Sequence, residues 1–300
     1  MKLFKTLSFT LLFSIFIVAC SNETTTTSEE DSGYENEHLL VDTNWLEENI
    51  EDTIVIDIRD EEEYEGGHIP GAVHLDRGEI TDQDNPVFGV LVEEEVFQDV
   101  MQSKGINDDS TIVIYDGGNS LWASRLFYGL ELYGHEDVRI LNGGFTAWLS
   151  DELELSTEAP AVEEGNFTAT LNPDLQASQT KVEEFIGDDT CVIIDTRSDG
   201  EYDGSDVRAE RGGHIPGATH IEWSEALNAE GIPTFKSAEE LEELFSTAGV
   251  DRDKTIVPYC QTNVRGAHTY FSLRLLGFEN IIPYEGSWAE WGNDPESQID

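Results

Sequence analysis

Short apolar runs alternate with longer amphipathic stretches along most of the chain. In the first half, the apolar runs lie at 53–58, 111–115 and 138–141, and the amphipathic stretches lie at 93–104 and 122–132. Runs of four to six apolar residues between helices are typical of parallel strands that helices cover on both faces. The pattern therefore predicts an α/β domain.

The second half of the chain repeats this pattern. Apolar runs lie at 192–195, 255–259 and 280–283, with helical stretches around 238–247 and 265–276. A chain of 300 residues is about two domains long. We therefore expect two copies of one α/β domain, each with a parallel sheet flanked by helices.

Sequence motifs are duplicated together with the hydrophobic pattern. GGHIPGA occurs at 66–72 and again at 212–218. Matched landmarks lie 138 to 146 residues apart: Asp57 and Asp195, His68 and His214, Asp116 and Cys260, and Trp148 and Trp291. Because only the second copy has a cysteine at the end of this strand, we predict the chemistry in the second copy.

These landmarks and the composition between them divide the chain into five parts. We predict a signal peptide at 1–19, a flexible acidic Ser/Thr tether at 20–38, domain 1 at 39–151, a linker at 152–173 and domain 2 at 174–296. The linker is long enough to wrap around one domain before it enters the next.

The N-terminus resembles a bacterial lipoprotein signal. Lys2 and Lys5 precede an apolar stretch that is too short for a stable transmembrane helix and that ends in Ala19 and Cys20. This resemblance implies that Cys20 carries a lipid and that the protein is an extracytoplasmic lipoprotein, attached to the cell membrane through this anchor only. The alternative is an ordinary secretory signal in which Cys20 is incidental.

Acidic residues greatly outnumber basic ones. The chain has 63 Asp and Glu against 16 Lys and Arg, which gives a formal net charge of -47. Self-repulsion on this scale destabilises a compact state unless counter-ions screen it, so we expect a saline or alkaline surrounding. Nucleic acid is excluded as a partner by the same charge. Individual acidic runs are also compatible with ordinary solvated helix faces.

Cys260 is the candidate nucleophile. It follows the apolar run 255–259 and precedes CQTNVR and a helical stretch, which places it near a helix N-terminus. In open α/β sheets, ligands bind at the carboxyl ends of the strands. Backbone N–H groups, the helix dipole and a neighbouring guanidinium such as that of Arg265 all favour a thiolate. With Cys20 assigned to lipid, Cys191 remains, and we expect it to be a buried packing residue.

The duplicated DxR and GGHIPGA motifs, the YCQTNVR loop and the terminal YEGSWAEWG together resemble the tandem-domain rhodaneses, which are thiosulfate and 3-mercaptopyruvate sulfurtransferases. The resemblance covers about residues 40–295. It implies a five-stranded parallel sheet in each domain, a non-catalytic domain 1 with Asp116 in place of cysteine, and a persulfide on Cys260. It also implies a substrate-binding loop formed by Gln261, Thr262, Asn263, Val264 and Arg265.

The resemblance leaves the sulfur donor open between thiosulfate and 3-mercaptopyruvate, with cyanide or a thiol as acceptor. Glu201 stands where several relatives have a substrate-binding arginine, and Arg211 is either its replacement or a surface residue. We include Arg197 among the substrate-binding residues and expect Asp195 to support the site. No cofactor and no metal are predicted, and we expect a monomer.

Four other side chains have structural interpretations beside their functional ones. His68 and His214 lie without a second metal ligand at suitable spacing, which favours histidines that fix the turn. Trp288 and Trp291 either line the mouth of the site or pack in the core.

Three other functions remain open at this stage. A cysteine-dependent phosphatase has five residues between its cysteine and arginine, whereas four residues, Gln261 to Val264, separate them here. A non-catalytic solute-binding or sulfur-sensing lipoprotein is a second possibility, and a persulfide carrier for a partner is a third. Hydrolysis of a chromogenic phosphate ester would identify the phosphatase.

Overall fold

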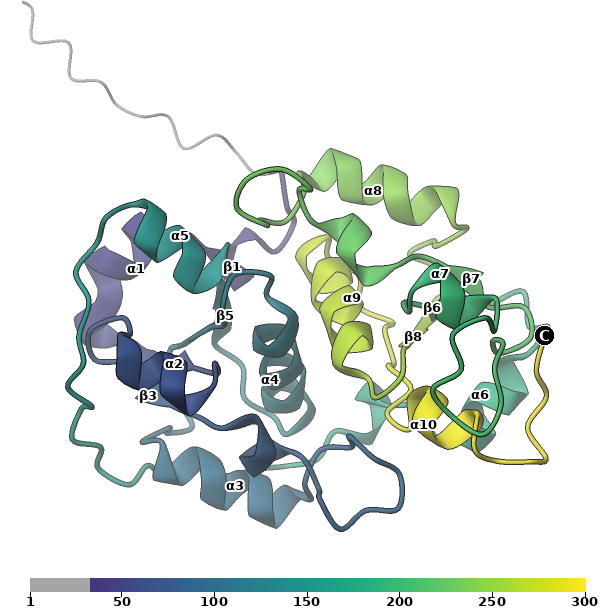
Figure 1. The fold of residues 1–300 in the computed structure, drawn as a ribbon, viewed down its shortest axis with the longest axis horizontal. Helices are drawn as coiled ribbons and strands as arrows, with labels where there is room; N and C mark the ends of the chain where they lie inside the picture. The colour runs from purple at the N-terminus through teal and green to yellow at the C-terminus, as the bar shows by residue number, and fades with distance from the viewer. Residues whose placement is uncertain (1–32) are drawn as a thin grey trace, which may run out of the picture. The chain divides into compact units, whose positions relative to one another are not determined.

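A computed structural model describes residues 33–300 (Figure 1). The predicted signal peptide, Cys20 and most of the predicted tether lie outside the described residues. Residues 39–151 form domain 1 and residues 174–296 form domain 2. Among residues 33–300, no helix combines the length and the apolar character that are needed to cross a membrane.

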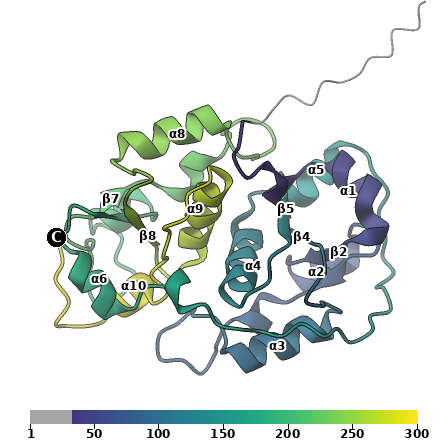
Figure 2. The ribbon, with the colours of Figure 1, turned by 180° about the vertical axis from the view of Figure 1, so that it is seen from behind.

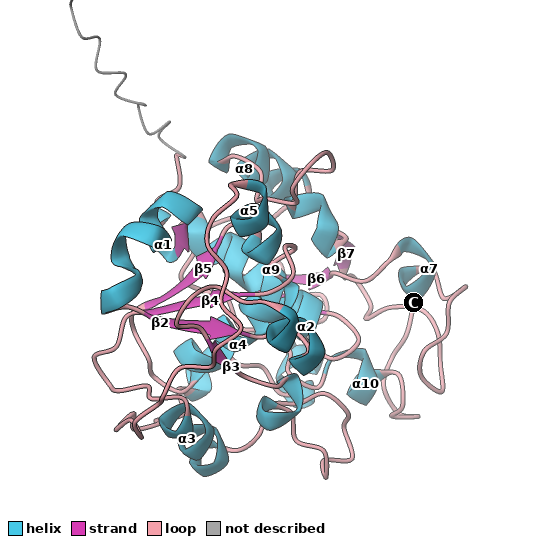
Figure 3. Ribbon diagram, turned by 60° about the vertical axis from the view of Figure 1, so that its left-hand side comes forward, coloured by secondary structure: helices cyan, strands magenta, loops and turns pink. Residues whose placement is uncertain are grey.

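Domain 1 contains the predicted five-stranded parallel sheet. Its strands are β1 (Leu40–Val41), β2 (Ile54–Asp57), β3 (Val73–His74), β4 (Ile112–Tyr115) and β5 (Val138–Leu141). Their order is β1-β5-β4-β2-β3 and every pair is parallel (Figure 3). Its helices are α1 (Thr43–Asn49), α2 (Glu61–Gly66), α3 (Glu94–Ser103), α4 (Leu121–Leu132) and α5 (Gly144–Ser150), with 3-10 turns η1 (Glu37–Leu39), η2 (Ile50–Asp52) and η3 (Arg77–Ile80).

Domain 2 repeats the helices of domain 1 and three of its five strands. Its strands are β6 (Cys191–Asp195), β7 (Thr219–His220) and β8 (Thr255–Tyr259). Its helices are α6 (Gln179–Phe185), α7 (Asp199–Tyr202), α8 (Ala238–Thr247), α9 (Val264–Leu275) and α10 (Ser287–Trp291), with 3-10 turns η4 (Pro173–Leu175) and η5 (Trp223–Ala226).

The sheet of domain 2 has three regular strands, in the order β7-β6-β8, where five were expected. Two further parallel contacts, Ile256↔Ile281 and Ala177↔Tyr284, are single bridges that continue the strand order of domain 1. Pro258 in β8 has no N–H group for the neighbouring chain, and a proline removes a ladder hydrogen bond. The predicted strand at 280–283 is therefore reduced to bridge contacts.

Alternating residues of each strand face different helices. In β4, Val113 and Tyr115 pack in the cluster that includes residues of α1 and α5, whereas Ile112 and Ile114 pack in the cluster that includes residues of α3 and α4. The strands are thus buried on both faces, as the continuous apolar runs predicted.

One hydrophobic core extends through both domains. Helices α4 and α9 pack against each other, with Phe127 against Phe271 at a centroid distance of 4.8 Å and Tyr128 against Tyr270 at 5.2 Å. The cluster that contains these rings also contains strand residues of both sheets. Residues 33–300 consequently form one compact unit.

The segment between the domains runs back along domain 1 (Figure 2). The backbone of Ser156 pairs with that of His68, the N–H of Phe167 donates to the carbonyl of Ile106, and the N–H of Thr170 donates to the carbonyl of Tyr133. These bonds tie the linker to the surface of domain 1.

Candidate active site

Cys260 lies at the carboxyl end of β8, directly before the loop that enters α9. Its side chain is buried, and the N–H of Thr262 donates to Cys260 Sγ over 3.4 Å. The N–H of Cys260 donates to Ser287 Oγ over 3.3 Å, and the N–H of Trp288 donates to the carbonyl of Cys260. The cysteine backbone is therefore held on both sides, and its sulfur faces the Thr262 amide at the N-terminal end of a helix.

Asn263 makes the tight turn from the loop into α9. Its φ of 57° lies in the left-handed region, which asparagine tolerates better than most residues. Its Nδ2 donates to Glu285 Oε2 over 2.7 Å, and the side chain is fully buried. Glu285 thus holds the turn that positions the catalytic loop.

Domain 1 contributes to this arrangement through Arg125 on α4. Its guanidinium forms a two-point ion pair with Glu285, at 2.5 and 2.9 Å, and also donates to the carbonyl of Gly89. Burial would raise the pKa of Glu285, but the charge of Arg125 and the hydrogen bonds from Arg125, Asn263 and the Leu91 N–H hold it below its ordinary value. Glu285 is therefore charged, and its carboxylate links Arg125 of domain 1 to Asn263 of domain 2.

Gly89 of domain 1 packs directly on Thr262 of the catalytic loop. A Cβ atom at Gly89 would lie 2.5 Å from Thr262 Cβ, and its φ of 92° also favours glycine. The opposite side has a similar contact, because a Cβ atom at Gly143 of domain 1 would lie 2.7 Å from Ile232 of domain 2. Each domain thus places a loop against the strand-end region of the other.

Arg265 points back toward Cys260 from the first turn of α9. Its guanidinium donates to both oxygens of Glu201, at 2.6 and 2.9 Å. Burial would lower the pKa of Arg265, but the hydrogen bonds with Glu201 and the charges of Cys260 and Glu201 raise it above its ordinary value. The structure thus brings Arg265 to the thiol, as expected, but the cation is already paired.

Two arginines that we expected to bind substrate have structural roles. Arg197 is buried, forms a two-point pair with Asp195, and donates to the carbonyl of Gly213 over 2.7 Å. Arg211 donates to the carbonyls of Trp291, Asp294 and Ser297 in the C-terminal segment. Each guanidinium is thus engaged within the protein, and a contact of either arginine with substrate stays a prediction. These contacts agree with the supporting role expected of Asp195.

In domain 1, the backbone amides of the loop between β4 and α4 hold the carboxylate of Asp116. Asp116 Oδ1 accepts from the N–H groups of Gly118 and Ser120, at 2.9 and 3.0 Å, and Oδ2 accepts from those of Trp122 and Ala123. A carboxylate thus fills the position at which Cys260 carries its sulfur in domain 2. The fold at this point is an anion-binding nest.

The remaining residues that the sequence singled out have structural surroundings. His68 and His214 stack on Tyr64 and Tyr202 at centroid distances of 3.9 and 3.8 Å, and each bonds the carbonyl of its tyrosine. Trp288 and Trp291 are buried in the core of domain 2. Within residues 33–300, no group of three or more histidine, cysteine or acidic side chains is placed to hold a metal ion.

Cys191, expected to be a buried packing residue, is half-buried at the start of β6 and packs against the core of domain 2. Burial, with the charge of Asp188, raises its pKa to about 12. The thiol therefore stays protonated at neutral pH and is a poor nucleophile.

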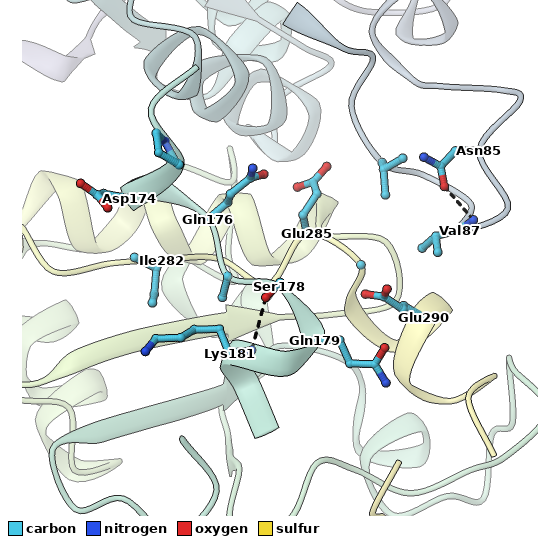
Figure 4. A pocket seen from close by; sticks show the side chains of 14 residues that line it. Asn85, Val87, Asp174, Gln176, Ser178, Gln179, Lys181, Ile282, Glu285 and Glu290 are labelled. Atoms are coloured by element: carbon cyan, nitrogen blue, oxygen red, sulfur yellow. Dashed lines mark hydrogen bonds between the residues drawn. The ribbon is translucent and has the colours of Figure 1, made fainter. Parts of the chain in front are cut away.

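A cavity of about 650 Å³ lies beside the site (Figure 4). Figure 4 shows Glu285 and Glu290 from domain 2, Asn85 and Val87 from domain 1, and Lys181 of α6 around it. Cys260 is not among the residues that line this cavity. The cavity therefore borders Glu285 and not the Cys260 thiol.

Sequence reasoning missed Arg125, Arg208 and the contact role of Gly89. Gln261 Nε2 donates to the carbonyl of Arg208, which places this half-exposed arginine next to the catalytic loop. Glu285 and Ser287 belong to the terminal YEGSW motif, so the sequence could have indicated them as site residues. No local motif indicated Arg125, because 160 residues separate it from Glu285.

Fold and site together define a two-domain α/β protein with a buried cysteine at a helix N-terminus. Comparison with known proteins supports this description. A model of the rhodanese-like domain matches residues 42–151 and 178–294. The chain therefore belongs to the rhodanese family, and it is a sulfurtransferase.

Several relatives cover almost the whole chain. It is 38% identical over 277 residues to the sulfur carrier protein TtuD of Thermus thermophilus, which covers 87% of this chain and 96% of the relative. It is 35% identical over 284 residues to a thiosulfate sulfurtransferase of Corynebacterium glutamicum, covering 87% and 89% of the two chains.

Solved structures share the fold. SseA of Escherichia coli, described as a 3-mercaptopyruvate sulfotransferase, superposes with a TM-score of 0.75 at 33% identity, covering 83% of this chain and 98% of that one. An anaerobic ergothioneine biosynthesis enzyme of Chlorobium limicola superposes with a TM-score of 0.80 at 24% identity, covering 89% and 71%.

Proposed function

We propose that this sulfurtransferase moves a sulfane sulfur through a persulfide on Cys260. The observation that carries the proposal is the buried Cys260 Sγ, which faces the Thr262 N–H and the Arg265 guanidinium at the start of α9. A thiolate at this position is stabilised by the same kind of amide cluster that holds the Asp116 carboxylate in domain 1.

With thiosulfate as donor, the Cys260 thiolate attacks the outer sulfur. The sulfur–sulfur bond of the donor breaks, and sulfite leaves with its electron pair. With 3-mercaptopyruvate, the carbon–sulfur bond breaks and pyruvate leaves as its enolate, which takes a proton from water. Either route leaves a persulfide on Cys260, and the transfer is divided into two steps.

In the second step, a thiophilic acceptor attacks the outer sulfur of the persulfide. Cyanide gives thiocyanate, a thiol gives a new persulfide, and the Cys260 thiolate returns in both cases. The amides from Gln261 to Arg265 stabilise the anion that is present in each step, as an oxyanion hole does.

The test is a mass measurement on the intact protein after incubation with each donor. We expect a gain of one sulfur atom that cyanide removes, and that is absent in Cys260→Ser. Cys191→Ser is the matched control and should still gain the sulfur. No gain with either donor would contradict the proposed function.

A persulfide carrier is the second candidate function. It is favoured by the 38% identity to a relative named a sulfur carrier protein. The carrier and the enzyme differ only in the acceptor, which would be a thiol of a partner protein. Once it has been loaded and the donor removed, a carrier should keep its persulfide in the presence of a small thiol. The enzyme should lose it to that thiol in a single turnover.

We also propose that the protein is extracytoplasmic and held at the cell membrane by a lipid on Cys20. The support is the sequence at Ala19 and Cys20, after two lysines and a short apolar stretch. Incorporation of a labelled fatty acid that is lost in Cys20→Ser would support this location. Unchanged release of both forms into the medium would contradict it.

A further inference from the structure

Glu201 is an acidic residue at the centre of the catalytic domain. Its carboxylate is 1% exposed and accepts from Arg265, from the Ser198 hydroxyl at 3.0 Å and from the Ser198 N–H at 3.2 Å. A second cation, Arg208, lies 3.5 Å away from it. Burying a carboxylate is costly unless it is paired, and here the pairing is with the arginine that faces the nucleophile.

Four arginines around the catalytic loop each have an acidic partner. The pairs are Arg265 with Glu201, Arg208 with Asp206, Arg197 with Asp195 and Arg125 with Glu285. Their formal charges cancel. The site therefore meets a donor with little net positive charge, in a protein that is strongly negative overall.

We propose that Glu201 determines donor specificity by charge, so that the site favours sulfur donors with at most one negative charge. This inference rests on the proposed function. The preferred donors are thiol monocarboxylates and organic persulfides. Glu201 lowers kcat/KM most for thiosulfate, which carries two negative charges.

The physical reason is that Coulomb energy scales with the charge of the donor. The carboxylate of Glu201 repels a dianion about twice as strongly as a monoanion at the same distance, and it neutralises the cation that would attract either. Burial would raise the pKa of Glu201, but Arg265 and Ser198 lower it to about 2. This charge is therefore present throughout the pH range of an assay.

The test is Glu201→Gln, which keeps the shape of the side chain and one hydrogen bond to Arg265 while removing the charge. We expect kcat/KM for thiosulfate to rise roughly tenfold and that for 3-mercaptopyruvate roughly threefold, so that the ratio shifts toward thiosulfate. Both donors are measured at one fixed ionic strength.

Glu63 offers a matched control. It occupies the position in α2 that Glu201 occupies in α7, and it is exposed. Glu63→Gln changes the net charge of the protein by the same amount, so it should leave the donor ratio unchanged. A ratio that moved equally in both variants would overturn the proposal in favour of a general charge effect.

A second variant keeps the proposal testable if Glu201→Gln fails to fold. Asp206 is exposed and pairs with Arg208 at 2.7 Å, so Asp206→Asn frees the second cation without disturbing the core. We expect the ratio to shift in the same direction, by about twofold. An equal loss of activity with both donors in Glu201→Gln, or an unchanged ratio in both variants, would show that Glu201 is only structural.

The mass measurement on the wild-type protein separates this inference from the proposed function. If neither donor adds sulfur to wild-type Cys260, the proposed function fails before specificity arises. If both donors add sulfur and the ratio does not move in the variants, only the role of Glu201 fails.

Discussion

His268 is a buried histidine that the mechanism does not use. It lies on α9, stacks on Phe235 at 4.9 Å and meets the edge of Trp223 at 5.1 Å. Neither ring nitrogen makes a hydrogen bond of normal geometry. Burial lowers its pKa to about 3, against a small opposing effect of the Asn119 backbone. The neutral ring is thus required for the folded state.

This residue should make folding stability depend on pH. A histidine with a lowered pKa stabilises the fold fully above its unfolded pKa of about 6.5, and the contribution is lost as pH falls from there toward 3. When the pH is lowered from 7.5 to 5, the free energy of unfolding of wild type should fall by about 2 kcal/mol more than that of His268→Leu. Urea unfolding at the two pH values measures this difference.

His38 is exposed on η1, so His38→Gln is the control and should follow wild type at both pH values. If the free energy of unfolding changed equally with pH in His268→Leu and in wild type, protonation of the buried ring would not destabilise the fold.

At the scale of residues, the sequence located the loop around Cys260 better than the side chains that hold this loop in place. Cys260, Arg265 and the left-handed Asn263 were found because they lie in one continuous loop whose motif is local. The intramolecular partners of Arg197 and Arg211 were not predicted, because the sequence does not show which acceptors a guanidinium meets after folding. The partner of Glu201 was hidden for the same reason, although its unusual position was visible.

At the scale of elements, the contact between α4 and α9 carries the ion pair that holds the catalytic loop. Breaking a buried pair by removing one partner costs about 3–5 kcal/mol, because the other charge stays buried. We expect Arg125→Met to destabilise the protein by about this amount and to lower kcat/KM with either donor at least tenfold. Urea unfolding measures the loss of stability. Sulfite release from thiosulfate and pyruvate release from 3-mercaptopyruvate measure the loss of activity.

The double variant Arg125→Met, Glu285→Leu separates stability from positioning. Two apolar residues should restore only part of the lost stability, because no charge is left unpaired but the Leu91 N–H and the Asn263 amide lose their acceptor. Activity should stay low, because Asn263 has then lost the carboxylate that holds the left-handed turn. Full recovery of activity in the double variant would show that the pair only stabilises the fold.

The elements themselves were largely predictable from hydrophobic periodicity. The expected helix at 238–247 is found at Ala238–Thr247, and that at 122–132 is found at Leu121–Leu132. The strand at 280–283 was not recovered as a regular strand, because its apolar pattern carries no information about the missing N–H of Pro258. The packing of α4 on α9 was not predicted either, since both helices bury almost all of their surface and neither shows a single apolar face.

At the scale of the whole molecule, the two copies are not independent domains. The duplication predicted two cores, whereas the structure has one core that continues through α4 and α9, beside a smaller outer core in each copy. Domain 1 supplies Arg125, which pairs with Glu285, and Gly89, which packs on Thr262, to the surroundings of the Cys260 loop.

The net charge of -47 sets the long-range field that an anionic donor meets. Because the arginines around the loop are paired, they cannot reverse this field at a distance. Raising the ionic strength from 10 mM to 150 mM shortens the screening length from about 30 Å to about 8 Å. We therefore expect kcat/KM for thiosulfate to rise several-fold over this range and then to level off, with a smaller rise for 3-mercaptopyruvate.

Alkylation of Cys260 by iodoacetamide is the control, because an uncharged reagent feels no long-range field and its rate should stay constant. The salt series also tests the charge balance of the site. A flat or falling rate with thiosulfate would mean that Arg208 and Arg265 attract the donor in spite of their partners. In Glu201→Gln, where one cation is released, the rise should become shallower, since local attraction then offsets the repulsion of the whole molecule.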